Sequence, residues 1–172
     1  MKAAMLILLL GSASFGQTAA IGKPTSASLR IELRTSPAQV RMSDDVALSV
    51  FFYSPNKQVT IWNALAWGVT AGLYLTVFDS SGRQVRNNFA PFFHPVPPDI
   101  TGKDALITIG GRVFAGFDSK IPIKTLVLRP GRYTLRCSYR APLNRDYFQG
   151  HTIWGEEDGS VEADPVSINV TE

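Results

Sequence analysis

The side chains that could perform chemistry are few and lie far apart in this chain. A single cysteine, Cys137, excludes an intrachain disulfide and a cysteine-based zinc site. The two histidines, His94 and His151, leave little material for a metal centre. Phosphate loops, nucleophile elbows, HExxH motifs and paired-carboxylate motifs are all missing from the sequence. We therefore expect a protein that is not an enzyme and that uses no metal and no cofactor.

Charge is distributed unevenly along the chain. Residues 112–145 contain eight basic side chains and one acid, whereas residues 146–172 contain seven acids and neither lysine nor arginine. Arg132, Arg136 and Arg140 share one face of a single strand. We expect the basic and acidic segments to neutralise each other across neighbouring strands. The alternative is an anion-binding face for polysaccharide or lipid headgroups. The net charge of +3 is too small to indicate a nucleic-acid partner.

Two irregular segments concentrate aromatic side chains. The segment 87–102 carries four prolines, and its density of proline predicts a long loop. Its candidate binding residues are Phe89, Phe92, Phe93 and His94. Trp154, in the loop after His151, is the corresponding residue of the second segment. These aromatics either form a recognition surface or plug the open end of the domain.

The acidic triplet Glu156-Glu157-Asp158 stands before Gly159 in the second of these segments. Oxygen-rich acidic loops suit Ca²⁺, but the spacing does not match an EF-hand loop. We expect a solvated hairpin tip here and no metal site.

The N-terminus has the order of a secretory signal peptide. Lys2 precedes an uninterrupted apolar run, residues 3–10, and small and polar residues follow. Cleavage after Gly16 is expected, with cleavage after Ala20 as the alternative. A retained anchor is disfavoured because a membrane-spanning helix needs about 20 apolar residues. We expect a signal peptide at 1–16, a flexible mature N-terminus at 17–26 and one domain at 27–171, exported to the periplasm or the exterior without a stable membrane span.

Alternating apolar and polar residues predict short β-strands throughout the domain. The segments expected to be strands are 29–34, 46–52, 58–67, 73–78, 84–86, 105–109, 132–140 and 166–170. Segment 114–123 is expected to be irregular and 124–128 to lead into the next strand. Seven to eight strands joined by frequent turns indicate an all-β, immunoglobulin-like antiparallel sandwich without the inter-sheet disulfide.

The string from Leu128 to Leu135 predicts a tyrosine corner. Pro130 and Gly131 suit a tight turn, and the hydroxyl of Tyr133 can bond back to the backbone there. In immunoglobulin-like domains the second cysteine follows two residues after this tyrosine, and here that position is Leu135. Apolar packing of Leu135 against Leu48 is expected to replace the disulfide, with Trp62 as the core tryptophan. Cys137, on the same apolar parity, is expected to be a buried, inert thiol.

The C-terminal half resembles a group of uncharacterised secreted bacterial immunoglobulin-like domains. The shared pattern is L-x-P-G-x-Y-x-L with a second tyrosine, then W-G-x-E-D-G, then V-x-I-x-V, here residues 128–135, Tyr139, 154–159 and 166–170. The resemblance implies a fold and an export route but no activity. We expect a binding or structural module of the cell envelope that engages a protein partner or another envelope component through its loops. A proteinase-inhibitor-like module and a carbohydrate-binding module are the alternatives, and the sequence indicates no particular oligomeric state.

Overall fold

The computed structural model describes residues 29–63, 65–68, 71–86, 89 and 105–172. The expected signal peptide (1–16), the expected flexible segment (17–26) and the candidate residues Phe92, Phe93 and His94 lie outside the described residues. Within the described part of the chain, no helix is both long and apolar enough to cross a membrane.

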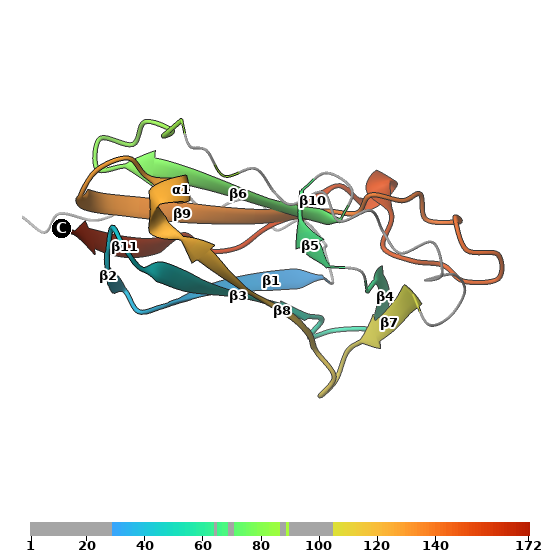
Figure 1. The fold of residues 1–172 in the computed structure, drawn as a ribbon. Helices are drawn as coiled ribbons and strands as arrows, with labels where there is room; N and C mark the ends of the chain where they lie inside the picture. The colour runs from blue at the N-terminus through green and yellow to red at the C-terminus, as the bar shows by residue number, and fades with distance from the viewer. Residues whose placement is uncertain (1–28, 64, 69–70, 87–88, 90–104) are drawn as a thin grey trace, which may run out of the picture.

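Two main sheets pack face to face, as the prediction of an all-β sandwich requires (Figure 1). The first sheet has the strand order β1-β3-β8 and is antiparallel throughout. Its strands are β1 (Arg30–Ser36), β3 (Asp45–Tyr53) and β8 (Ala115–Pro122).

The second sheet has the order β2-β11-β9-β6-β5, and β10 also pairs with β9. Its central strands are antiparallel, whereas the pairs β2–β11 and β5–β6 at its margins are parallel. The strands are β2 (Gln39–Arg41), β5 (Ala66–Trp67), β6 (Gly72–Asp79), β9 (Gly131–Arg140), β10 (Ser160–Glu162) and β11 (Val166–Thr171). A separate antiparallel pair, β4 (Val59–Trp62) with β7 (Leu106–Ile109), lies at one end of the sandwich (Figure 1).

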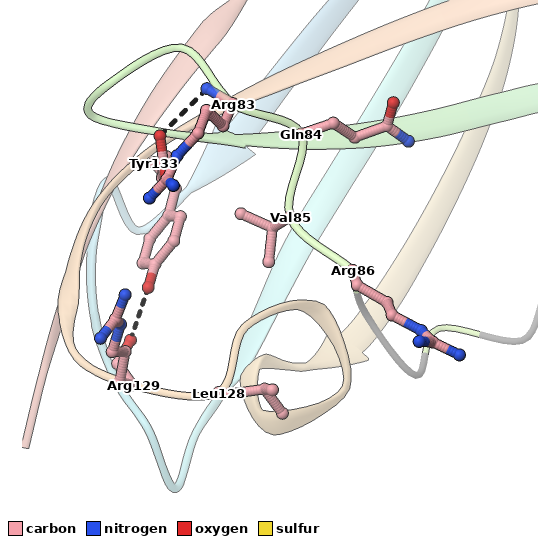
Figure 2. Close-up of a pocket in the computed structure, with 8 residues that line it drawn as sticks. Arg83, Gln84, Val85, Arg86, Leu128, Arg129 and Tyr133 are labelled. Carbon is pink, nitrogen blue, oxygen red and sulfur yellow. Dashed lines mark hydrogen bonds and ion pairs between the residues drawn. The ribbon is translucent and has the colours of Figure 1, made fainter.

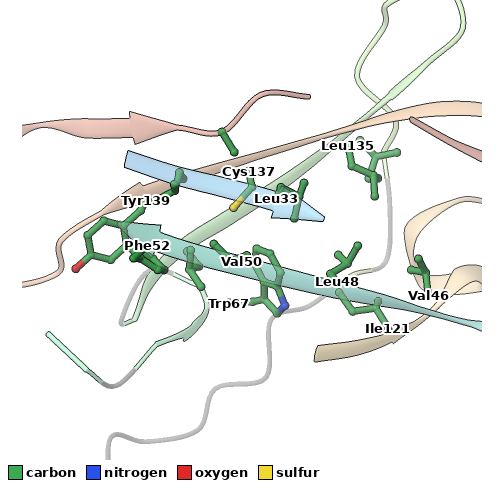
Figure 3. Packing of buried hydrophobic residues seen from close by; sticks show 14 of the residues in the cluster. Leu33, Val46, Leu48, Val50, Phe52, Trp67, Ile121, Leu135, Cys137 and Tyr139 are labelled. Atoms are coloured by element: carbon green, nitrogen blue, oxygen red, sulfur yellow. The ribbon is translucent and has the colours of Figure 1, made fainter. Parts of the chain in front are cut away.

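The core fills the space between the two main sheets (Figure 3). On β3 the alternation is complete, because every second residue from Val46 to Phe52 is buried. On β9 the buried face includes Leu135, Cys137 and Tyr139. The rings of Phe52 and Tyr139 meet edge to face across the core, with centroids 5.0 Å apart. Burial of each large apolar side chain stabilises the fold by about 1.5–3 kcal/mol, so this alternation determines which face of each strand turns inward.

The strand number exceeds the predicted seven to eight, because the described residues form eleven strands. Three of them, β2, β5 and β10, have only two or three residues, which is too short for alternation to be recognised. The single strand expected at 58–67 is two strands, β4 and β5, that belong to different sheets.

The prediction that segment 114–123 is irregular is wrong. Strand β8 occupies it and pairs with β3 along its whole length. Its sequence AGFDSKIP contains residues that are uncommon in strands, and the partner strand supplies the hydrogen bonds that local propensity does not. The segment after it, expected to lead into a strand, forms the one-turn helix α1 (Ile123–Leu126). Both of its apolar residues, Ile123 and Leu126, are buried.

The assignment of Trp62 to the central core is also wrong. Trp62 belongs to a small separate cluster with Ala105, Phe148 and Ile153. The tryptophan in the main core is Trp67 of β5, whose Nε1 donates a 2.7 Å hydrogen bond to the Ser119 hydroxyl of the opposite sheet. Leu48 and Leu135 do share the main core, as expected.

Candidate functional site

Residues 141–159 connect β9 to β10 and form a loop that is hydrogen-bonded to itself across its width. The backbone N–H of Ile153 donates to the carbonyl of Arg145 (3.2 Å), and that of Glu156 donates to the carbonyl of Leu143 (2.9 Å). The two halves of the loop therefore run against each other. We refer to residues 141–159 as the β9–β10 loop.

Acidic side chains hold this loop together through hydrogen bonds and an ion pair. The Asp158 carboxylate accepts a hydrogen bond from the Gly155 N–H (2.9 Å) and forms an ion pair with the Arg145 guanidinium (2.6 Å). The Glu157 carboxylate accepts the Arg145 N–H at 3.0 Å. Gly155 has no Cβ to obstruct this arrangement, because a Cβ there would overlap the backbone nitrogen of Arg145. These acids belong to a 3-10 helix, Glu156–Asp158, and bind arginine and backbone.

The expected hairpin tip is thus a tightly bonded turn. Across the described residues, no three or more His, Cys, Asp or Glu side chains gather in a way that could hold a metal ion.

The three arginines of β9 are all exposed on its outer face, as their alternation predicts. Arg140 forms a 2.6 Å ion pair with Glu156, which is one instance of the expected neutralisation between the basic segment and the acidic tail. The Arg136 guanidinium lies over the ring of Phe78, 4.7 Å from its centroid. Arg132 has no ionic partner among the residues that the structure describes. Two of the three cations therefore already have partners within the protein.

Trp154 does not present its ring to solvent as a free recognition residue would. The residue is half-buried and packs against the main core, and its backbone N–H donates to the carbonyl of Thr60 in β4 at 2.7 Å. Phe89 is the one described residue of the segment 87–102. It is likewise half-buried against the core, with its ring centroid 6.3 Å from that of Trp67. Both positions correspond to the plug alternative.

The exposed aromatic of the β9–β10 loop is Tyr147, which was not among the residues predicted from the sequence. Its side chain is 61% exposed. Its ring meets the ring of Phe148 edge to face at 5.1 Å, and Phe148 stacks on Trp62 at 5.6 Å with an interplanar angle of 26°. The three rings form a series from the buried Trp62 to the exposed Tyr147. The available signal in the sequence was the adjacent aromatic pair Tyr147-Phe148 in an irregular segment.

The tyrosine corner is present at the start of β9. The Tyr133 hydroxyl donates a 2.8 Å hydrogen bond to the carbonyl of Arg129, and its ring packs on Gly131. Gly131 has a φ of 154°, which favours glycine, and Pro130 before it is exposed. The residues after the corner, Leu135 and Cys137, are buried as expected.

A pocket of about 480 Å³ lies beside this corner, between the turn after β6 and the segment before β9 (Figure 2). Three arginines line it together with one acid, a tyrosine, a glutamine and two aliphatic residues. The lining residues are Asp79, Arg83, Gln84, Val85, Arg86, Leu128, Arg129 and Tyr133. They come from segments about 45 residues apart in sequence, so no local motif could reveal the pocket.

Hydrogen bonds hold the acid of this pocket in its ionised form. The Ser81 hydroxyl and the backbone N–H groups of Arg83 and Ser81 all donate to one oxygen of the Asp79 carboxylate. These bonds, chiefly that from the Ser81 hydroxyl, together with the Arg83 cation, lower the pKa of Asp79 to about 2. Its other oxygen lies 3.3 Å from the Arg83 guanidinium.

Comparison with models of known protein families and with curated proteins produced no match for this chain.

Proposed function

We propose that this protein is an exported, non-catalytic binding module of the bacterial cell envelope, and that it engages a protein partner through its loops. The observation that carries the proposal is the state of the β9–β10 loop. It displays Tyr147 at 61% exposure while the residues around it are fixed by hydrogen bonds and ion pairs. A large aromatic side chain on a rigid loop is the typical anchor of a protein interface.

Rigidity matters here because binding must offset the entropy of ordering the loop. The Arg145–Asp158 ion pair and the bonds that Gly155 and Arg145 donate hold the loop before any partner arrives. The Tyr147 ring contacts the Phe148 ring, which in turn stacks on the buried Trp62. A loop that is already ordered loses less conformational entropy on binding than a flexible one.

A protein partner is favoured over a polysaccharide by the engagement of the β9 arginines. Glu156 neutralises Arg140, and the Arg136 guanidinium lies over the Phe78 ring, so two of the three arginines are engaged within the protein and are less available to an anionic glycan. The inhibitor alternative is less favoured because the loop turns on itself. The N–H of Tyr147 bonds to the carbonyl of Asn144 and that of His151 to the carbonyl of Phe148. Such turns leave no extended backbone segment to pair with a protease cleft.

The test is a comparison of two tyrosine variants in capture from the native envelope fraction. Immobilised wild-type protein should retain a partner that Tyr147→Ala fails to retain, as quantified by mass spectrometry. Tyr53→Ala is the matched control, because Tyr53 is also exposed but stands at the end of β3. It should retain the partner, and both variants should keep the wild-type unfolding midpoint. Equal capture by Tyr147→Ala and the wild type would refute the role of the loop.

Export is tested separately by the mass of the protein recovered from the periplasm of an expressing bacterium. The recovered chain should begin at Gln17. A full-length chain held in the membrane fraction would refute it.

A further inference from the structure

We propose that the pocket beside the tyrosine corner is a second binding site, which takes a carboxylate attached to a short aliphatic group. The site is independent of the β9–β10 loop, because its lining comes from residues 79–86 and 128–133. Its volume of about 480 Å³ lies within the range of small-molecule pockets.

The cationic part of the site is formed by Arg129 and Arg83. In Figure 2 their guanidinium groups lie on the Tyr133 side of the pocket, whereas the side chain of Arg86 is directed away. Arg129 has no ionic partner among the described residues, and its backbone carbonyl is fixed by the Tyr133 hydroxyl. A guanidinium offers two parallel N–H donors to a carboxylate, so an unpaired arginine in a pocket favours an anionic ligand.

Arg83 is held in place by its own turn. Its Nε donates to the Ser81 hydroxyl at 3.1 Å and its Nη2 lies 3.3 Å from the Asp79 carboxylate. A guanidinium carries five N–H donors, so these two contacts leave others for a ligand. Among the described residues that line the pocket, Asp79 is the only acid, against three arginines. The lining therefore retains an excess of positive charge with Asp79 ionised.

The aliphatic part of the site is formed by Val85 and Leu128. Leu128 is 69% exposed, the highest value among the exposed large apolar residues of the described chain. Val85 is half-buried, and its side chain points toward Tyr133 in Figure 2. An exposed leucine at the rim of a cationic pocket gains by covering an apolar group of the ligand. This pairing of charge and apolar surface favours an organic carboxylate over an inorganic anion.

The probe is N-acetylleucine, compared with N-acetylleucinamide and acetate. N-acetylleucinamide keeps the aliphatic chain but lacks the charge, and acetate keeps the charge but lacks the chain. NMR titration of the purified protein should show saturable shifts of the amide signals of 79–86 and 128–133 with N-acetylleucine at millimolar concentrations. Each comparison compound should bind at least about fivefold more weakly, because each lacks one of the two kinds of contact.

Arginine variants locate the carboxylate. Arg129→Gln should raise the dissociation constant for N-acetylleucine about tenfold, in the range expected for a hydrogen bond to a charged group. Arg132→Gln is the matched control, since Arg132 is an exposed arginine of β9 that does not line the pocket. It should leave the dissociation constant unchanged. Neither side chain is buried, so both variants should fold.

Three results would overturn the proposal. They are the absence of saturable shifts in this pocket with N-acetylleucine, equal binding of N-acetylleucinamide, and an equal effect of Arg129→Gln and Arg132→Gln. Inorganic phosphate is a further arm of the titration. Binding of phosphate as tight as that of N-acetylleucine would assign the pocket to anions in general and overturn the aliphatic part.

Discussion

Tyr133 and Tyr139 share the buried face of β9, yet only the hydroxyl of Tyr133 has a hydrogen-bond partner. That hydroxyl donates to the carbonyl of Arg129 at 2.8 Å. The hydroxyl of Tyr139 is buried and has no partner among the described residues. Burial raises the pKa of Tyr139, so its hydroxyl stays protonated as an unused donor. The two phenols stand on one strand and differ in what their oxygen atoms contribute to stability.

Removal of each hydroxyl should therefore have a different effect. Tyr133→Phe loses a hydrogen bond and should reduce the free energy of unfolding by about 0.5–1.5 kcal/mol. Tyr139→Phe removes a buried polar atom that has no partner, so the free energy of unfolding should stay equal or rise. Urea denaturation of the wild type and both variants measures the difference. A larger loss from Tyr139→Phe than from Tyr133→Phe would contradict this account.

The lack of a side chain at Gly155 should be essential to the β9–β10 loop. In Gly155→Ala the new Cβ would overlap the backbone nitrogen of Arg145, so the loop must shift, at a cost of about 1–3 kcal/mol. Gly116→Ala in β8 is the control, since its nearest neighbour would be a Phe51 ring carbon at an ordinary 3.7 Å. Urea denaturation should show a clear loss for Gly155→Ala and little change for Gly116→Ala. Similar free energies of unfolding for the two variants would show that the loop accommodates the new Cβ without loss of stability.

The Arg145–Asp158 ion pair should control the mobility of the loop more than global stability. Asp158→Asn weakens both the pair and the acceptor of the Gly155 N–H. Hydrogen exchange of the amides of 153–159 should become faster, while the unfolding midpoint changes little because the pair is partly exposed. Glu32→Gln is the control, because it weakens the pair of similar length, 2.7 Å, with Arg34 on β1. Unchanged exchange in Asp158→Asn would show that the loop does not depend on this pair.

Alternation of residue types was sufficient to predict strands whose partners lie on both sides. On β9 the apolar positions from Tyr133 to Tyr139 are all buried, and on β3 those from Val46 to Phe52 are as well. Strand β8 was not predicted, because its inward positions include Ala115 and Ser119. These small or polar side chains do not produce the alternation of apolar and polar residues that marks a strand. Its extended conformation depends on pairing with β3, about 70 residues earlier in the chain. A strand partner so distant cannot be predicted from the local sequence.

For the candidate sites, too, residue types were predictive where local sequence decides the structure and failed where distant segments decide it. The loop acids were recognised as a hairpin tip, but their bonds to Arg145 and to the Gly155 N–H depend on how the loop closes. Trp154 was selected because a tryptophan in an irregular segment suggests recognition. Its partial burial against the core follows from the position of β4, whose Thr60 carbonyl accepts the backbone N–H of Trp154. Residue type thus singled out this loop as a candidate, whereas the choice between Trp154 and Tyr147 as its exposed aromatic required tertiary structure.

Acid should destabilise the protein in part through Asp79. Its folded pKa of about 2 lies below the ordinary 3.8, so its contribution to stability is complete above about pH 4 and is lost as the pH falls toward 2. The unfolding midpoint of the wild type should therefore fall more steeply over this interval than that of Asp79→Asn. Asp164→Asn is the control, because Asp164 is exposed and accepts no hydrogen bond within the described residues. Parallel curves for the wild type and Asp79→Asn would contradict the role of the turn.

The thiol of Cys137 should be unreactive until the protein unfolds. The side chain is 1% exposed between the two sheets, and burial raises its pKa to about 12. The thiolate is the reactive form, so at pH 8 both access and ionisation oppose reaction. An aromatic disulfide reagent should leave the native protein unmodified and label one thiol in denaturant. Ser167→Cys, which places a thiol on the exposed face of β11, is the positive control and should react at once without denaturant. Rapid labelling of Cys137 in the native protein would mean that the two sheets separate readily at this point of the core.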